Sequence, residues 1–143
     1  MEAVDLASIT REAVQNGLSS WEGHVNIHVV DGTFVKADRE KLYRTLVNGI
    51  RNASEATGPG GTFRISTAVD GRWIELRIED TGPGLSAEGV ARIFTPFFTT
   101  KADGTGLGLA YAQKVVKGMG GIIELKNKKN ERGAVLGIRL PAA

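Results

Sequence analysis

Three glycines at alternate positions, Gly104, Gly106 and Gly108, most strongly constrain how this chain of 143 residues can fold. Glycine tolerates positive φ and lets backbone N–H groups approach an anion closely. Apolar residues at helical spacing follow, so the segment is expected to form the start of a helix. The free N–H groups at such a helix start can bind an anion. The GxGxG spacing differs from the dinucleotide-binding GxGxxG, and no Gly-Lys pair is present for a Gly-Lys-Ser/Thr phosphate loop.

Composition places the chain among globular proteins, with 41% apolar and 24% charged residues. A net charge of +2 favours neither a nucleic acid nor an acidic membrane surface as partner. The absence of cysteine excludes disulfides, thiolate metal sites and cysteine nucleophiles. No apolar run approaches the ~20 residues that cross a bilayer, and the N-terminus lacks signal-peptide features. We therefore expect one cytoplasmic domain over residues 1–143.

Hydrophobic periodicity predicts helices alternating with hairpins. Caps and apolar spacing predict helices near residues 5–17, 38–57, 86–93 and 109–119. Alternation and turn residues predict strand pairs at 25–29 with 34–35, 62–69 with 72–79, and 122–126 with 134–140. Pro141 is expected to end the last ladder. The fold expected is an α+β two-layer sandwich, a mixed, mostly antiparallel sheet with helices on one face. The basic stretch 126–132 is interpreted as a solvated hairpin turn.

The strand at 72–79 directs a carboxylate towards the core. Ile74, Leu76 and Ile78 point one way, and the period of two places Asp80 on the same side. A buried carboxylate needs hydrogen-bond donors. Two interpretations remain open here: Asp80 caps the glycine turn behind it, or it accepts hydrogen bonds from a ligand at the bottom of a pocket.

The helix at 38–57 carries a second polar group. Thr45, Asn48, Asn52 and Glu55 share a face away from its apolar stripe. Taken alone, the two carboxamides are as typical of a solvated surface as of a site. Asn52 offers a neutral oxygen to Mg²⁺, which prefers oxygen donors together with water and phosphate.

Together these segments suit a magnesium-bound nucleoside triphosphate. Asp80 can accept the exocyclic amine of adenine, and Gly82 and Gly84 let the backbone lie flat against a base. The glycine loop at 104–108 can face the phosphates. Lys101, just before it, can reach the terminal phosphate and neutralise charge during transfer.

In this order the segments resemble the ATP-binding catalytic domain of sensor histidine kinases, within the ATPase superfamily that also contains DNA gyrase. Residues 46–53 resemble the N box, 80–85 the G1 box, 93–98 the F box and 104–109 the G2 box. The resemblance runs from about residue 5 to Pro141. It implies ATP and Mg²⁺ as ligands, with residues 94–104 as a short lid over the nucleotide.

The resemblance also implies roles for individual residues. Asn48 and Lys101 are expected to act in catalysis, and Asn52 to bind the metal. The residues expected to contact the nucleotide are Asn48, Asn52, Glu55, Asp80, Gly82, Gly84, Leu85, Ile93, Phe98, Thr99, Thr100, Lys101, Gly104, Thr105, Gly106, Leu107, Gly108 and Leu109.

The implied reaction transfers the γ-phosphate to a histidine on a separate helical dimerisation domain, and from there to a response regulator. His24 and His28, each followed by valine in an expected strand, are interpreted as surface residues. The phosphoacceptor is therefore expected on another domain of a kinase that can itself be membrane-anchored. Without the dimerisation helices, this domain by itself is expected to be a monomer.

Two departures from the family pattern bear on the reaction. Asn48 stands where ATP-hydrolysing relatives carry a glutamate that activates water, and losing a general base costs about 10²–10⁴ in rate. Ala134 stands where the family often has threonine or serine near the adenine, so a hydroxyl that could bridge a water is missing there. Because of Asn48, transfer is expected over hydrolysis. A nucleotide-responsive binding module of the anti-sigma type, which shares the same motifs, is the alternative, and an ATP-hydrolysing clamp is disfavoured.

Overall fold

The computed structural model describes residues 1–18, 20–98 and 107–143. One layer is a five-stranded sheet of order β2-β4-β5-β7-β6. Its strands are β2 (His24–His28), β4 (Thr62–Asp70), β5 (Trp73–Glu79), β6 (Ile122–Asn127) and β7 (Ala134–Pro141). β2 pairs with β4 in parallel, and every other neighbouring pair is antiparallel. The expected α+β sandwich with a mixed, mostly antiparallel sheet is confirmed.

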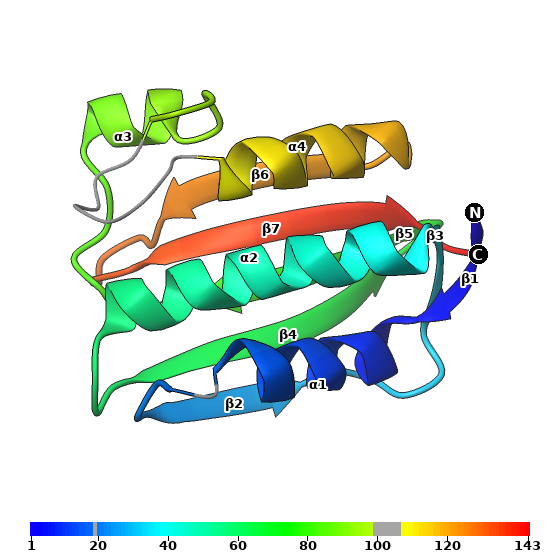
Figure 1. The fold of residues 1–143 in the computed structure, drawn as a ribbon, viewed down its shortest axis with the longest axis horizontal. Helices are drawn as coiled ribbons and strands as arrows, with labels where there is room; N and C mark the ends of the chain where they lie inside the picture. The colour runs from blue at the N-terminus through cyan, green and yellow to red at the C-terminus, as the bar shows by residue number, and fades with distance from the viewer. Residues whose placement is uncertain (19, 99–106) are drawn as a thin grey trace.

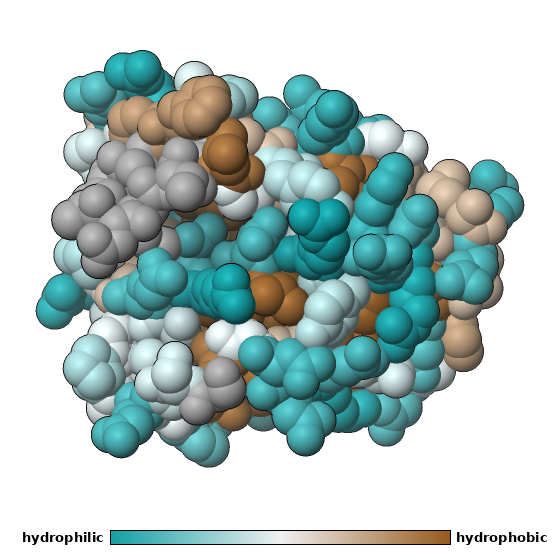
Figure 2. Space-filling view, in the orientation of Figure 1, coloured by the Kyte–Doolittle hydropathy of each residue, from teal (hydrophilic) through white to brown (hydrophobic). Residues whose placement is uncertain are grey.

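Most of the described helices form the second layer on one face of the sheet, and one stands apart from them (Figure 1). The layer consists of α1 (Leu6–Gly17), α2 (Arg39–Thr57) and α4 (Gly108–Gly118), and the separate helix is α3 (Ala87–Arg92). Asp5 and Asp38 cap α1 and α2 through their carboxylates, as expected. The helical face is largely hydrophilic, with hydrophobic side chains visible between the helices (Figure 2). Among the described helices none is long and apolar enough to cross a membrane.

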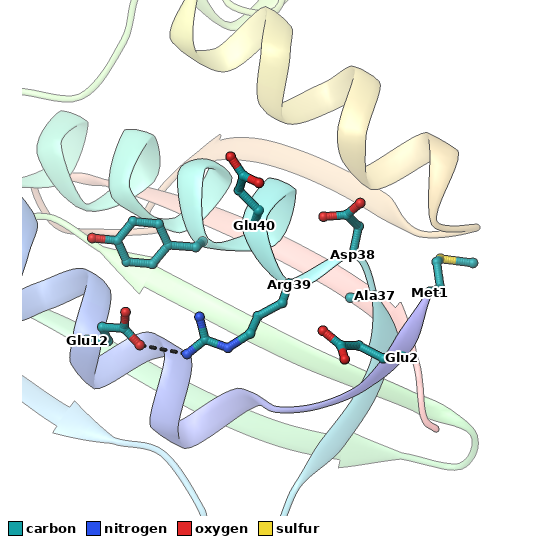
Figure 3. Close-up of a pocket in the computed structure, with 8 residues that line it drawn as sticks. Met1, Glu2, Glu12, Ala37, Asp38, Arg39 and Glu40 are labelled. Carbon is teal, nitrogen blue, oxygen red and sulfur yellow. Dashed lines mark hydrogen bonds and ion pairs between the residues drawn. The ribbon is translucent and has the colours of Figure 1, made fainter.

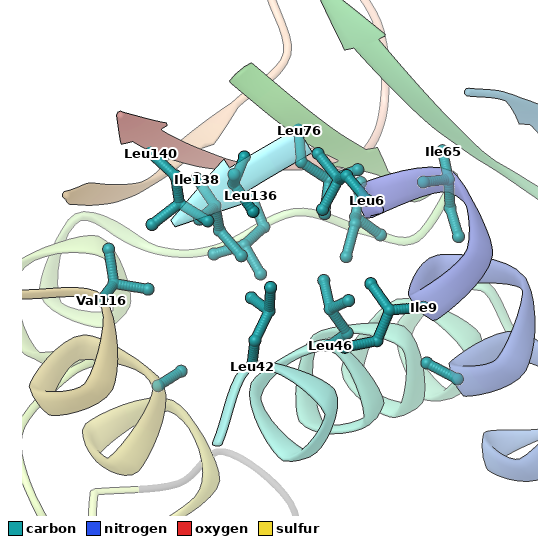
Figure 4. Packing of buried hydrophobic residues seen from close by; sticks show 14 of the residues in the cluster. Leu6, Ile9, Leu42, Leu46, Ile65, Leu76, Val116, Leu136, Ile138 and Leu140 are labelled. Carbon is teal, nitrogen blue, oxygen red and sulfur yellow. The ribbon is translucent and has the colours of Figure 1, made fainter. Parts of the chain in front are cut away.

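The core lies between α2 and the sheet. Leu42 and Leu46 of α2 are fully buried and face Leu136 and Ile138 of β7 (Figure 4). Gly49 allows this approach, because a Cβ there would lie 2.9 Å from the Leu136 side chain. The apolar stripe predicted for this helix is confirmed.

The hairpin predicted between β2 and β3 (Phe34–Ala37) is wrong. β3 pairs antiparallel with β1 (Glu2–Asp5) in a separate two-stranded sheet, while β2 lies beside β4. Gly32 does adopt a positive φ of 77°, so the turn signal was correct. A turn reverses the chain locally but does not determine which strand the returning segment joins. The segment at residues 2–5 was too short to show a distinct strand period.

Pro141 also departs from its expected role. It is the last paired residue of β7, opposite Trp73, and Ala142 then forms a bridge to Val35. The chain thus continues pairing beyond the proline, because only the N–H of residue 141 is missing from the ladder. His24 and His28 are exposed on β2, as expected.

Thr45 on α2 buries a hydroxyl for which the described part of the chain provides no hydrogen-bond partner. We expect Thr45→Val to raise the free energy of unfolding by about 1 kcal/mol, because valine keeps the shape and removes an unpaired polar group. Urea unfolding measures the change. Thr45→Ser is the matched control: it keeps the hydroxyl, loses the methyl group and should be less stable than wild type. A Thr45→Val variant less stable than wild type would contradict the statement that the buried Thr45 hydroxyl has no hydrogen-bond partner.

Candidate functional site

Asp80, at the end of β5, is 9% exposed, so the inward direction predicted from strand alternation is confirmed. Its Oδ1 accepts hydrogen bonds from the backbone N–H groups of Gly82 and Ala134, both at 3.0 Å. Both donors reach the same oxygen, and among the described residues none reaches Oδ2. The carboxylate therefore does cap the glycine turn. It does so with one oxygen, and the second keeps its capacity to accept hydrogen bonds from a ligand.

The glycine turn after Asp80 packs against the C-terminal end of α2. A Cβ on Gly82 would lie 2.3 Å from the carbonyl oxygen of Ala56, so only glycine fits there. Thr81 N–H donates to the Thr57 hydroxyl at 3.2 Å, which ties the turn to the same helix end. The base-recognition loop predicted from the sequence thus lies beside the helix that carries Asn52.

Part of the polar face of α2 packs against α4. Asn48 Nδ2 donates to the carbonyl oxygen of Gly108 at 3.2 Å, which joins α2 to the first turn of α4. Asn52 is half-buried on the same face, and Glu55 is exposed. Both of these residues take part in interactions. The Asn48 carboxamide therefore belongs to a packed interface between two helices, which a solvated surface face would not provide.

The other predicted site residues that the structure describes lie around α3 and α4. Ile93 follows α3 and is partly buried against the core. The guanidinium carbon of Arg92 lies over the Phe98 ring, 5.2 Å from the ring centre. Leu107 is exposed, whereas Leu109 is 9% exposed and belongs to the core. Leu109 thus supports the site from within the core. The predicted residues Thr99, Thr100, Lys101, Gly104, Thr105 and Gly106 lie outside the described residues.

Asn127, the last residue of β6, was missed by the sequence analysis. Its Oδ1 accepts from Leu85 N–H at 2.8 Å, and its Nδ2 donates to Leu85 O at 2.7 Å. The composition of residues 126–132 indicates a solvated turn instead. Only the pairing register, which sets Asn127 opposite Ala134, places it next to the loop after Asp80.

A hollow of about 550 Å³ lies at the other end of α2 (Figure 3). It is lined by Met1, Glu2, Glu12, Ala37, Asp38, Arg39, Glu40 and Tyr43. Glu12 accepts a 2.7 Å hydrogen bond from Arg39 and raises the pKa of that guanidinium. None of the predicted site residues that the structure describes lines this hollow, and it lies at the opposite end of α2 from the turn after Asp80.

The sandwich, the buried aspartate before a glycine turn and the neighbouring carboxamide helix define an ATPase-type domain. The family model described as histidine kinase-, DNA gyrase B-, and HSP90-like ATPase matches residues 37–143. The chain belongs to this family. The catalytic domain of histidine kinase ThkA is 30% identical, with a TM-score of 0.86, over 99% of this chain and 96% of that chain.

Two further relatives agree with this membership. A mycobacterial sensor histidine kinase, MprB, has a TM-score of 0.89 at 27% identity, covering 99% of this chain and 97% of that chain. Sensor histidine kinase ZraS of Escherichia coli (strain K12) is 36% identical over 107 residues, which are 75% of this chain and 23% of ZraS. The chain thus spans about a quarter of that relative's length. The resemblance to sensor histidine kinases is confirmed.

Proposed function

We propose that this domain binds Mg-ATP and donates the γ-phosphate to a histidine on a separate helical dimerisation domain of a two-component sensor kinase. The observation that carries the proposal is the Asp80 carboxylate, buried and held through one oxygen by Gly82 and Ala134. Such a group is oriented before any ligand arrives, so its second oxygen can recognise an amine without reorganisation. Adenine offers that amine at its exocyclic position.

The loop after Asp80 provides the surface on which the base would rest. Gly82 is in van der Waals reach of Ala56 on one side, so the turn cannot move deeper into the protein. Gly84 has a φ of 80°, which keeps the backbone in a shape that side chains rarely adopt. A base that enters this site meets flat backbone and a fixed acceptor. This combination suits a purine with an amine donor.

Asn52 fits the role of magnesium ligand. Mg²⁺ takes few protein ligands in nucleotide sites and completes its shell with water and phosphate oxygens, so a single carboxamide oxygen can serve as one of its ligands. In the described ranges no three acidic or histidine side chains gather as a metal-binding group. When bound, the ion neutralises charge on the phosphates. Asn52 is half-buried on α2, and the C-terminal end of that helix is tied to the turn after Asp80 by the hydrogen bond from Thr81 N–H to the Thr57 hydroxyl.

Asn52→Ala is expected to remove the dependence of ATP affinity on Mg²⁺, with a loss of roughly tenfold or more in affinity when the ion is present. Calorimetric titrations with Mg²⁺ and with a chelator measure this dependence. Asn16→Ala is the matched control, because that carboxamide donates to the Tyr43 hydroxyl on an exposed part of the surface. A variant that keeps the full magnesium effect would refute the role of Asn52.

Asn48 supports phosphoryl transfer over hydrolysis. Its Nδ2 already donates to Gly108 O, and a carboxamide cannot take a proton from water at neutral pH. A nucleophile from another domain then has the advantage over water. Lys101 is proposed to neutralise the terminal phosphate during transfer, as its place before the glycine loop in the sequence indicates.

The reaction is tested with γ-labelled ATP, this domain and an added helical phosphoacceptor domain. We expect acid-labile label on the acceptor and little release of free phosphate without it. ATP binding without any transfer would favour the nucleotide-responsive binding module of the anti-sigma type. Rapid turnover by the domain alone would favour a hydrolysing clamp. Either result would refute the proposed transfer.

A further inference from the structure

We infer that Asn127 is a positioning residue for base recognition, holding the loop after Asp80 in the shape that distinguishes adenine from other bases. The inference rests on the proposed function. Asn127 engages both backbone polar groups of Leu85: Oδ1 accepts from the N–H at 2.8 Å and Nδ2 donates to the carbonyl oxygen at 2.7 Å. The Asn127 side chain thereby makes the same pair of hydrogen bonds with Leu85 that the backbone of a neighbouring antiparallel strand would make.

The chemistry of this contact is specific to a carboxamide. A carboxylate at position 127 can accept from Leu85 N–H but cannot donate to its carbonyl, and an aliphatic side chain can do neither. Leu85 lies 42 residues away in the chain, so the contact joins the loop to a strand that does not neighbour it in sequence. The two bonds therefore fix both the position and the rotation of the peptide groups around Leu85.

Gly84 leaves room for this contact. A Cβ on Gly84 would lie 2.8 Å from Asn127 Oδ1, and its φ of 80° is one that other residues rarely adopt. A side chain there would displace the oxygen that accepts from Leu85. Position 84 thus serves the contact with Asn127 as well as the flat backbone expected beneath a base.

The end of the β6–β7 hairpin that carries Asn127 also holds Asp80, the proposed acceptor for the base. Asn127 pairs in register with Ala134, and Ala134 N–H donates to Asp80 Oδ1. The loop from residue 80 to residue 85 is therefore attached to the β6–β7 hairpin at both of its ends. This double attachment sets the separation between the Asp80 carboxylate and the backbone of Leu85.

Because Asn127 orders this loop when the protein folds, the free energy of ligand binding does not have to include the cost of ordering it. Without Asn127 the part of the loop around Leu85 would sample other shapes, while Gly82 and Ala134 would still hold Asp80, and the base would lose its fitted surface. The predicted consequence is weaker binding together with weaker discrimination between bases. Loss of a side chain that merely stabilised the fold would lower the apparent ATP affinity through unfolding and leave the discrimination between bases unaltered.

Asn127→Leu removes both bonds, and Asn127→Asp keeps only the acceptor. Measured by calorimetry at a temperature where each variant is folded, ATP affinity is expected to fall about five- to tenfold for leucine and about two- to threefold for aspartate. The ratio of ATP to GTP affinity should fall in the same order. Asn130→Gly is the matched control: it removes a carboxamide from the same hairpin at a residue with a φ of 62°, which glycine adopts without strain, and both quantities should stay unchanged.

Hydrogen exchange of the Leu85 amide provides a readout that needs no nucleotide. Exchange should be slow in the wild type and in Asn130→Gly, and fast in Asn127→Leu. A leucine variant that binds ATP with wild-type affinity and selectivity would overturn the inference alone and leave the proposed function standing. A wild-type protein that binds no ATP would overturn both. Slow Leu85 exchange in the leucine variant would likewise refute the positioning role.

Discussion

Asp80→Asn is expected to weaken ATP binding by about 10- to 150-fold while leaving the unfolding temperature nearly unchanged, because a hydrogen bond to a charged group contributes ~1.5–3 kcal/mol. Gly82 and Ala134 both donate to one oxygen of Asp80, so the carboxamide oxygen of the variant must take that place. Its NH₂ group then points to where the adenine amine is proposed to lie, and two donors would face one another.

Calorimetry and thermal unfolding measured on the same samples test this separation of affinity from stability. Asp80→Ala is the comparison variant, because it deprives the Gly82 and Ala134 N–H groups of their acceptor. It should lower ATP affinity and also reduce the free energy of unfolding by about 1–3 kcal/mol. An asparagine variant that binds ATP as tightly as the wild type would contradict the assigned role of the second carboxylate oxygen.

Gly82→Ala is the second variant with a large expected effect. The added Cβ would lie 2.3 Å from the carbonyl oxygen of Ala56 and 2.7 Å from its carbon, and backbone atoms cannot move aside as a flexible side chain can. The turn must leave the end of α2, and its N–H then leaves Asp80. We expect a loss of roughly 1–3 kcal/mol in the free energy of unfolding, together with most of the ATP affinity.

Urea unfolding measures this loss, and Gly118→Ala serves as its control. Gly118 is the last residue of α4, and a Cβ there meets nothing within 4 Å. That variant should be neutral or up to ~1 kcal/mol more stable, because alanine favours the helical state. Equal stability and affinity of the Gly82 variant and the wild type would show that the turn does not depend on its contact with α2.

Local periodicity accounts for the parts of the fold that could be predicted. The apolar stripe of α2 and the alternation along β5 are properties of neighbouring residues, so the buried faces and the direction of Asp80 followed from the sequence. The partner of β3 did not follow. Strand pairing is decided by contacts between distant segments, and the turn at Gly32 gave no information about them.

The same distinction applies to the site. Asp80 and the glycine turn are contiguous in sequence, and their arrangement could be predicted from strand alternation and turn chemistry. Asn127 reaches Leu85 across 42 residues, and Asn48 reaches Gly108 across 60, so neither contact leaves a local pattern. The roles assigned to Lys101 and to the glycines before Gly108 stay predictions from the sequence.

Backbone amide NMR during titration with a non-hydrolysable ATP analogue and Mg²⁺ tests the central claim most directly. The N–H groups of Gly82 and Ala134, which hold the Asp80 carboxylate, should shift strongly and saturate at one ligand per chain, while residues 39–43 at the other end of α2 should not respond. Unchanged Gly82 and Ala134 signals at saturating nucleotide, or shifts centred on residues 39–43, would show that Asp80 is not the base-recognising group.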